Sequence, residues 1–273
     1  MTKKIIAVST IIGVAITANT VLAEPDFPWL PAQLNTPGVQ KQLVNLPLPA
    51  DNSPVISLGF APDPQSQQIV EGYAIVHYAK GGPSKGKGGE NCYEFLAKDA
   101  KWKSVEPWTT NPTNTRGLDG NFVFGNLSAD ISKWESAAGA DILGDGTATS
   151  GILIADTVSP DGRNEVYFAD VADSNAIAVT VVWGIFGGPL SQRTIVEWDQ
   201  VYDEVDFDWS SSGEAGKMDF ENIATHELGH SVGLGDLYNS GCLEETMYGY
   251  ATEGEIKKRD LNAGDIAGIQ KLY

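Results

Sequence analysis

The stretch "IATHELGHSVGLGD", residues 223 to 236, most constrains what this chain can fold into. Its two histidines, His226 and His230, are four residues apart, and on a helix this spacing places them on nearly the same face. Two imidazoles in that arrangement can bind one metal ion. Glu227 faces the same cleft, where a carboxylate can hold a metal-bound water and act as a general base. The spacing therefore predicts a helix that carries a metal centre.

The residues that follow the second histidine extend this pattern. Gly233 lets the helix stop and the chain turn sharply, because glycine tolerates positive φ. Gly235 then precedes Asp236, whose carboxylate is an acceptable zinc ligand. Two histidines and one carboxylate leave a coordination position open for water, as a catalytic zinc requires. The alternative is that Asp236 is a solvated loop residue.

Three segments together resemble the metzincin clan of zinc proteases, and its matrixin branch most closely. They are "HELGHSVGLGD", the turn Thr246-Met247-Tyr248 and the closing "DIAGIQKLY". The resemblance covers about residues 100 to 273. It implies one catalytic Zn²⁺ bound by His226, His230 and Asp236, with Glu227 as the general base and Met247 beneath the metal.

The same resemblance implies how a substrate would bind. Tyr248 and Tyr250 lie where the family builds its specificity wall. The stretch "AIAVTVVWG" is the candidate edge strand, which would pair with an extended protein or peptide substrate.

The sequence also departs from the family pattern. Most matrixins have a third histidine where this chain has Asp236, and an aspartate there resembles the snapalysin-like minority (HExxHxxGxxD). Many matrixins hold a second, structural zinc with several histidines, but only His77 remains here, so we expect that site to be absent. Ca²⁺ could stabilise the chain instead, around "DILGDG" or "SPDGRNE", although both stretches are also typical of plain turns.

The first 23 residues have the three-part layout of a signal peptide, with Lys3 and Lys4 before an apolar run and a small-residue cleavage site at Ala23. The alternative is an uncleaved membrane anchor, but the apolar run is short for a span. We expect residues 24–99 to be an N-terminal extension or pro-segment, and residues 100–273 to form a matrixin-like metalloprotease domain. Within the extension, the Gly- and Lys-rich stretch at 80–91 is a natural place for proteolytic nicking.

The chain has two cysteines, Cys92 and Cys242. An even number in an exported chain favours one disulfide. Matrixin pro-segments can instead use a cysteine thiolate to cap the zinc, and Cys92 is placed at the end of the presumed extension, although its surroundings do not match that family motif. We favour the disulfide.

Hydrophobic periodicity predicts the other elements. The fold class is α+β, which the resemblance specifies as metzincin-like, with a twisted mixed sheet, an active-site helix and a C-terminal helix. The patterns predict strands over 67–80, 150–158, 164–171, 175–186 and 193–209, and helices over 126–139, 219–232 and 262–273.

The net negative charge of the chain limits the partners that it can bind. Signal cleavage removes two lysines and no acidic residue, which changes the formal charge from −18 to −20. Such an acidic protein would be repelled by the phosphates of nucleic acid. We expect a secreted, extracellular monomer without membrane attachment after cleavage. The main hypothesis is a zinc-dependent endopeptidase that hydrolyses peptide bonds through a metal-bound water activated by Glu227. The alternatives are a secreted, zinc-stabilised binding or surface protein without proteolytic activity, and a zinc hydrolase of a non-peptide bond.

Overall fold

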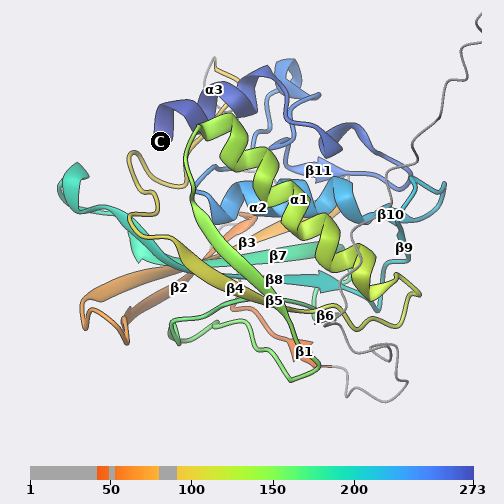
Figure 1. Cartoon of the computed structure of the whole chain (residues 1–273), viewed down its shortest axis with the longest axis horizontal. Coiled ribbons are helices and arrows are strands. Elements are labelled where there is room, and N and C mark those ends of the chain that lie inside the picture. The colour runs from red at the N-terminus through yellow and green to blue at the C-terminus, as the bar shows by residue number, and fades with distance from the viewer. Residues whose placement is uncertain (1–41, 49–52, 80–90) are drawn as a thin grey trace, which may run out of the picture.

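One mixed sheet forms the scaffold of the described part of the chain (Figure 1). The computed structural model describes residues 42–48, 53–79 and 91–273. The main path of the sheet runs β11-β3-β7-β8-β6-β4-β5, while β1 pairs with β6 and β2 with β3. The strands are β1 (Leu43–Val44), β2 (Val55–Pro62), β3 (Ile69–Ala79), β4 (Glu106–Asn111), β5 (Leu143–Ala148), β6 (Asn164–Val171), β7 (Ala176–Ile185), β8 (Thr194–Asp203) and β11 (Tyr250–Ala251). A separate parallel pair joins β9 (Trp209–Ser210) to β10 (Met218–Asp219).

Strand direction changes at β7. Strands β4, β5, β6 and β8 are mutually parallel along the sheet, whereas β7 runs antiparallel to both β8 and β3. The residues of β6 and β7 are almost all buried, because both faces of the sheet are covered.

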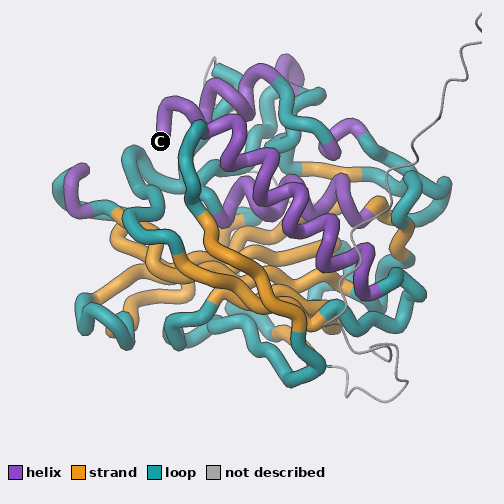
Figure 2. The backbone as a smooth tube through the Cα atoms, viewed as in Figure 1, coloured by secondary structure: helices purple, strands orange, loops and turns teal. Residues whose placement is uncertain are grey.

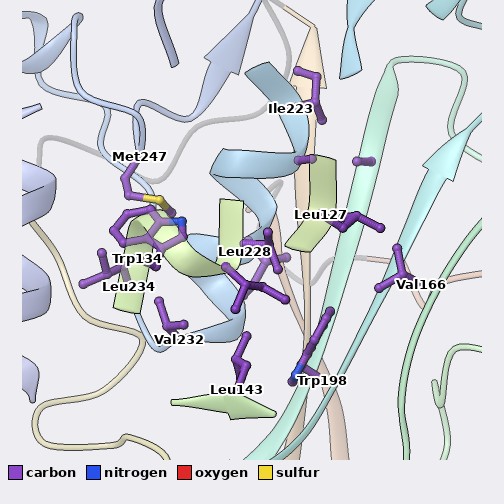
Figure 3. Close-up of a cluster of buried hydrophobic side chains, with 14 of the residues drawn as sticks. Leu127, Trp134, Leu143, Val166, Trp198, Ile223, Leu228, Val232, Leu234 and Met247 are labelled. Atoms are coloured by element: carbon purple, nitrogen blue, oxygen red, sulfur yellow. The ribbon is translucent and has the colours of Figure 1, made fainter. Parts of the chain in front are cut away.

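Three helices pack above one face of the sheet (Figure 2). They are α1 (Gly120–Ala138), α2 (Phe220–Ser231) and α3 (Ala263–Leu272). The core beneath them contains Trp134 of α1, Leu228 of α2 and Met247, and Figure 3 shows the Trp134 ring beside the Met247 side chain. The opposite face of the sheet is covered by a second apolar cluster that includes Val44, Ile56 and Leu153.

The metzincin-like α+β architecture predicted from the sequence is confirmed. The helix predicted over 219–232 is α2, with Asp219 as its N-cap and Val232 as its C-cap. Strands predicted over 164–171 and 175–186 are β6 and β7, and the last helix is α3.

The strand predicted over residues 150–158 is wrong. Those residues form a loop in which Ile152 and Ile154 are 74% and 61% exposed, while Leu153 and Ala155 are buried in the second apolar cluster, on the sheet face opposite the helices. The Ile154 amide donates to a side-chain oxygen of Glu165 instead of to a neighbouring strand. The apolar run therefore covers the sheet without joining it.

Two boundaries also differ from the prediction. Helix α1 begins at Gly120, because the Asp119 carboxylate caps it by accepting from two backbone amides of the first turn. It ends at Ala138, with the predicted Gly139 as its C-cap. Strand β8 ends at Asp203, well before residue 209, because the Asp203 carboxylate accepts the amides of Val205 and Asp206 and turns the chain.

The N-terminal segment supplies part of the sheet. Strand β3, predicted over 67–80, pairs along its length with β7, and β2 pairs with the other edge of β3. Residues 55–79 of the expected extension thus belong to the same sheet as the strands beyond residue 100. The resemblance predicted a free edge at "AIAVTVVWG", and this is wrong in the described structure, because β3 covers that edge of β7.

A disulfide joins Cys92 to Cys242, with their Cα atoms 5.3 Å apart. Neither cysteine is free, so a Cys92 thiolate that caps a metal is excluded in this structure. The bond ties the residues that follow β3 to the loop between α2 and Met247. Cross-linking positions 150 residues apart restricts the unfolded chain strongly.

Replacing both cysteines, in Cys92→Ser/Cys242→Ser, should lower the free energy of unfolding by ~4–5 kcal/mol, because the unfolded chain regains its loop entropy. Urea denaturation followed by tryptophan fluorescence measures the change. Ser240→Ala is the control, since that residue shares the 3₁₀ turn of Cys242 without forming the cross-link. An unchanged unfolding midpoint in the double variant would contradict the entropic account.

Candidate metal centre

A side-chain cap and an ion pair, both made by Asp219, fix the first turn of helix α2. The Asp219 carboxylate accepts the amide of Asn222 and pairs with Arg259, with an oxygen–nitrogen distance of 2.6 Å. An acidic group at a helix N-terminus also complements the helix dipole. This anchoring orients the helix so that His226, Glu227 and His230 are fully buried against strands β3 and β7.

The two histidines and Asp236 converge on one point. The Nε2 atoms of His226 and His230 lie 3.2 and 3.5 Å from Oδ1 of Asp236. Ligand atoms around a tetrahedral zinc with 2.0–2.1 Å bonds are separated by about 3.3–3.4 Å. The three side chains are 0–3% exposed, yet none of these three atoms has a hydrogen-bond partner in the described structure. This donor set fits a metal ion of the size and geometry of Zn²⁺.

Backbone carbonyls orient both imidazoles. Nδ1 of His226 donates to the carbonyl of Thr246 at 2.7 Å, and Nδ1 of His230 donates to the carbonyl of Leu234 at 2.9 Å. A carbonyl can only accept, so each Nδ1 carries the proton and each Nε2 presents a lone pair to the shared point. Burial lowers the pKa of His226 to about 3. Burial also opposes protonation of His230, but the Asp236 carboxylate outweighs it and raises the pKa of His230.

Glycine brings Asp236 back to the histidines. Gly233 has φ +106°, and a Cβ there would lie 3.0 Å from the carbonyl oxygen of Ala100. The following amide of Leu234 donates back to the carbonyl of Gly229, which closes the turn. Tyr238 then donates its hydroxyl to Oδ2 of Asp236 at 3.1 Å, leaving Oδ1 directed at the two histidines.

Met247, predicted as the floor of the site, packs against α2. The Asp265 carboxylate of α3 accepts the amides of Thr246 and Met247 at 2.7 and 3.1 Å. A Cβ on Gly229 would lie 2.2 Å from the Met247 sulfur and 2.9 Å from the Trp134 ring. Sequence reasoning missed Gly229, whose lack of a side chain lets the methionine turn approach α2.

Both oxygens of Glu227 are engaged. Thr180 of β7 donates its hydroxyl to Oε2 at 2.6 Å, and Oε1 lies 3.0 Å from Nδ1 of His77 in β3. Burial raises the pKa of Glu227 to about 7. Neither Thr180 nor His77 was identified from the sequence as a neighbour of Glu227. The motif gives no signal for them, because they come from strands far away in the chain.

A buried lysine extends this network. Nζ of Lys258 lies 3.1 Å from Nε2 of His77 and also donates to the carbonyl of Tyr248. Burial lowers the pKa of Lys258 to about 8. Because the ammonium can only donate, Nε2 of His77 accepts, and Nδ1 of His77 therefore donates to Glu227.

The two tyrosines assigned to the substrate wall border the same region. Tyr250 belongs to β11, which runs parallel to β3, and Tyr250 is paired opposite Tyr78. The Tyr248 and Tyr250 rings lie 6.0 Å apart, and Lys257 lies over the Tyr248 ring. The structure thus places Tyr250 next to β3, with Tyr248 beside Tyr250.

The fold is of the metzincin type, and the geometry of the three side chains fits a candidate metal centre. Residues 94–273 match the Matrixin family, and the chain belongs to that family. Its relatives include metalloendoproteinase 4-MMP of Arabidopsis thaliana, 41% identical over 69 residues, which are 25% of this chain and 18% of the relative. Matrilysin of Rattus norvegicus is 43% identical over 63 residues, 23% and 22% of the two chains, and matrilysin of Homo sapiens is 39% identical over 75 residues, 28% and 26%. The matches thus span about a quarter or less of each relative.

Proposed function

We propose that this chain is a zinc-dependent endopeptidase whose zinc ligands are His226, His230 and Asp236. The observation that carries the proposal is the set of three buried ligand atoms, spaced as around a tetrahedral ion and without other partners among the described residues. Membership of the matrixin family and relatives named as metalloendoproteinases support it. A single centre with three protein ligands leaves a coordination position for the reaction, whereas structural zinc sites generally use four.

Glu227 is the proposed general base. When bound, zinc polarises the scissile carbonyl and makes water a better nucleophile. Glu227 accepts a proton from the attacking water and returns it to the leaving amine. The Thr180 hydroxyl holds one oxygen of the carboxylate, which fixes the direction of the other. A pKa near 7, raised by burial, suits a group that must both accept and release a proton.

Asp236 gives the site a snapalysin-like character. A carboxylate ligand adds negative charge, so we expect the catalytic water to be less acidic than with three neutral imidazoles, and activity to peak at higher pH. Tyr238 offsets part of this charge through its hydrogen bond to Oδ2. Met247 is proposed as the floor of the site, with Tyr248 and Tyr250 as a wall of the substrate pocket.

Export is part of the proposal. The predicted signal peptide, residues 1–23, and residues 24–41 of the predicted extension lie outside the described residues. A disulfide is consistent with an oxidising, extracellular compartment. No helix in the described ranges is both long and apolar enough to cross a bilayer. We propose a secreted monomer that acts on proteins or peptides, with 100–273 as the protease domain.

Calcium is proposed at a second cluster, next to the predicted "SPDGRNE" loop. Carboxylate oxygens of Asp156, Asp161 and Glu197 lie within 4.8 Å of one another. Glu197 is fully buried, and its Oε1 has no hydrogen-bond partner in the described structure. Burial raises the pKa of Glu197 to about 9, which reflects how unfavourable its charge is without a cation. Ca²⁺ prefers several oxygen ligands of this kind.

One observation favours the alternative, a zinc-stabilised binding protein without proteolytic activity. Glu227 is 0% exposed, so no peptide reaches it in this conformation. Proteolysis therefore requires a conformational change, and the two functions are separated by whether a Glu227 variant loses an activity that the parent chain has.

Asp236→Ala should weaken zinc binding on the order of 100-fold or more. The substitution removes a metal ligand itself, and loss of a residue that only orients a ligand already weakens binding about 10- to 100-fold. Asp236→His should retain zinc, since it restores a neutral third imidazole. Zinc per chain is measured by mass spectrometry after dialysis against a competing chelator. Asp208→Ala, at a half-exposed side chain remote from the three ligands, is the control and should retain zinc. Full zinc content in Asp236→Ala would refute the ligand set.

Glu227→Gln should keep zinc and lose cleavage of an unfolded protein by roughly 10²–10⁴-fold, because the amide cannot accept the proton. Cleavage of a fluorogenic casein by the zinc-loaded chain provides the measurement. Glu214→Gln, at an exposed side chain that pairs only with Lys217 among described residues, is the matched control. Equal cleavage by the Glu227 variant and the control would rule out this mechanism.

Adding ~1 mM Ca²⁺ should raise the thermal unfolding midpoint of the parent chain, because the ion binds the folded state selectively. Glu197→Gln should abolish the increase, whereas Glu106→Gln on β4 should preserve it. Differential scanning calorimetry with Ca²⁺, Mg²⁺ or chelator present makes the comparison. The calcium site is absent if the parent midpoint does not respond.

A further inference from the structure

The turn that follows α2 serves two of the three proposed zinc ligands. The carbonyl of Leu234 accepts from Nδ1 of His230, and Asp236 lies two residues further along the chain. The position of this turn therefore decides both how the His230 imidazole is oriented and where the Asp236 carboxylate points. A ligand set binds a metal ion tightly when surrounding groups hold its members in place before the ion arrives.

A segment from a distant part of the sequence pairs with this turn. Leu96 donates its amide to the carbonyl of Gly233 at 3.0 Å, and Gly235 donates its amide to the carbonyl of Glu94 at the same distance. These two hydrogen bonds flank an antiparallel bridge at Leu234. A Cβ on Gly235 would lie 3.3 Å from Cγ of Glu94, so the two backbones are in close contact. The backbone on both sides of Leu234 is thus fixed by residues that precede β4.

Helix α3 also supports this segment. A Cβ on Gly264 would overlap the carbonyl oxygen of Cys92, and a Cβ on Gly268 would lie 2.7 Å from Cβ of Tyr93. The two glycines are one helical turn apart and give α3 a bare face on which Cys92 and Tyr93 pack directly. The Lys271 ammonium donates to the Tyr93 hydroxyl at 2.9 Å. The segment therefore contacts both α3 and the turn after α2.

The Cys92–Cys242 disulfide fixes the beginning of this segment. Cys242 lies in the loop that runs from Asp236 to Met247. Leu237 closes that loop by donating its amide to the carbonyl of Met247 at 2.8 Å. The covalent bond therefore ties the segment to the same loop that begins with Asp236. Without this bond, only hydrogen bonds and packing would hold the two backbones together.

We propose that residues 92–96 are a positioning element of the metal centre: cross-linked through Cys92 and Cys242, they hold the turn after α2 so that His230 and Asp236 face the ion. This inference rests on the proposed ligand set. It deepens that proposal, because it makes the zinc affinity of the chain depend on a covalent bond that involves none of the three ligands.

The zinc dissociation constant of the full-length chain, measured against a competing chelator, tests the role of the disulfide. Cys92→Ala/Cys242→Ala should weaken zinc binding about 10- to 100-fold, as loss of a group that orients a ligand does. The Co²⁺-loaded double variant should also differ from the parent in its visible absorption spectrum, because the ligand geometry changes. Ser240→Ala, in the same 3₁₀ turn as Cys242, should match the parent in both measurements. Unchanged affinity and spectrum in the folded double variant would overturn the inference.

Leu96→Pro tests the backbone pairing while the disulfide stays intact. Proline has no N–H, so the hydrogen bond to Gly233 is lost and zinc binding should weaken roughly 10-fold or more. Leu96→Ala keeps the amide and should keep the affinity of the parent. Lys98→Pro is the control, because Lys98 is the second residue of a turn closed by the Ala100 amide and the Ala97 carbonyl, where proline is favoured. Equal zinc affinity in the two Leu96 variants would contradict the proposed role of this segment.

A measurement on the parent chain needs no substitution. Coupling between two sites is reciprocal, so zinc must strengthen the pairing of Leu96 with the turn as much as that pairing strengthens zinc binding. Zinc should therefore slow hydrogen exchange of the Leu96 amide about 10- to 100-fold. It should leave the amide of Thr149 unchanged, which bonds to Thr110 near the β4–β5 edge of the sheet.

The same measurement separates this inference from the proposed function. If the parent binds zinc but Leu96 exchanges equally fast with and without it, the positioning role is refuted and the ligand set stands. If the parent binds no zinc, the proposed ligand set is refuted and the inference falls with it.

Discussion

The structure depends on the burial of α2, a helix that carries several polar side chains into the interior. A buried polar atom without a partner destabilises the fold by roughly 1–3 kcal/mol, so each of these groups constrains its surroundings. His226 and His230 are satisfied at Nδ1 by two carbonyls, and Glu227 by Thr180 and His77. The partners come from the methionine turn, from the turn after α2, and from β7 and β3. The helix can therefore be buried only when all these elements are in place.

Some buried side-chain atoms of α2 have no hydrogen-bond partner among the described residues, and they indicate where a ligand would bind. On α2 they are the Nε2 atoms of the two histidines and Nδ2 of Asn222. The two Nε2 atoms face the equally unpartnered Oδ1 of Asp236, whereas Asn222 lies at the far end of the helix. A protein interior leaves such atoms unpaired when something else binds them. A bound divalent cation would compensate the aspartate charge and both lone pairs at once, which supports the proposed ligand set.

The burial that stabilises this centre also prevents a peptide from reaching Glu227. The network Lys258–His77–Glu227 satisfies the polar groups of the closed centre, but it also removes the space in which a peptide would react. β3 contributes apolar residues to both cores, Ile75 on the helix side and Val70 and Val76 on the other. The arrangement is thus well packed, because β3 covers the edge of β7 together with apolar surface.

Local patterns were sufficient for much of the fold. The histidine spacing, the Asp219 cap and Gly139 located helices α2 and α1 because hydrogen bonds within a helix connect residues only a turn apart. The 150–158 stretch was assigned wrongly because pairing in a sheet depends on distant residues, which a local pattern does not show. Its apolar composition resembles a strand, but in the structure the amides of Ile154 and Ala155 donate to the side chains of Glu165 and Tyr167 instead of to a neighbouring strand.

The sequence by itself determined the helix that carries two proposed metal ligands, the glycines that return Asp236, and the family to which they point. Only the tertiary structure decided what surrounds Glu227. His77 lies 150 residues before it in the chain and Thr180 lies 47 residues before it. No local preference encodes such contacts, because they form only when β3 adds to β7 beneath the helix. The pairing of β3 with β7 is therefore the feature that encloses Glu227 in this structure.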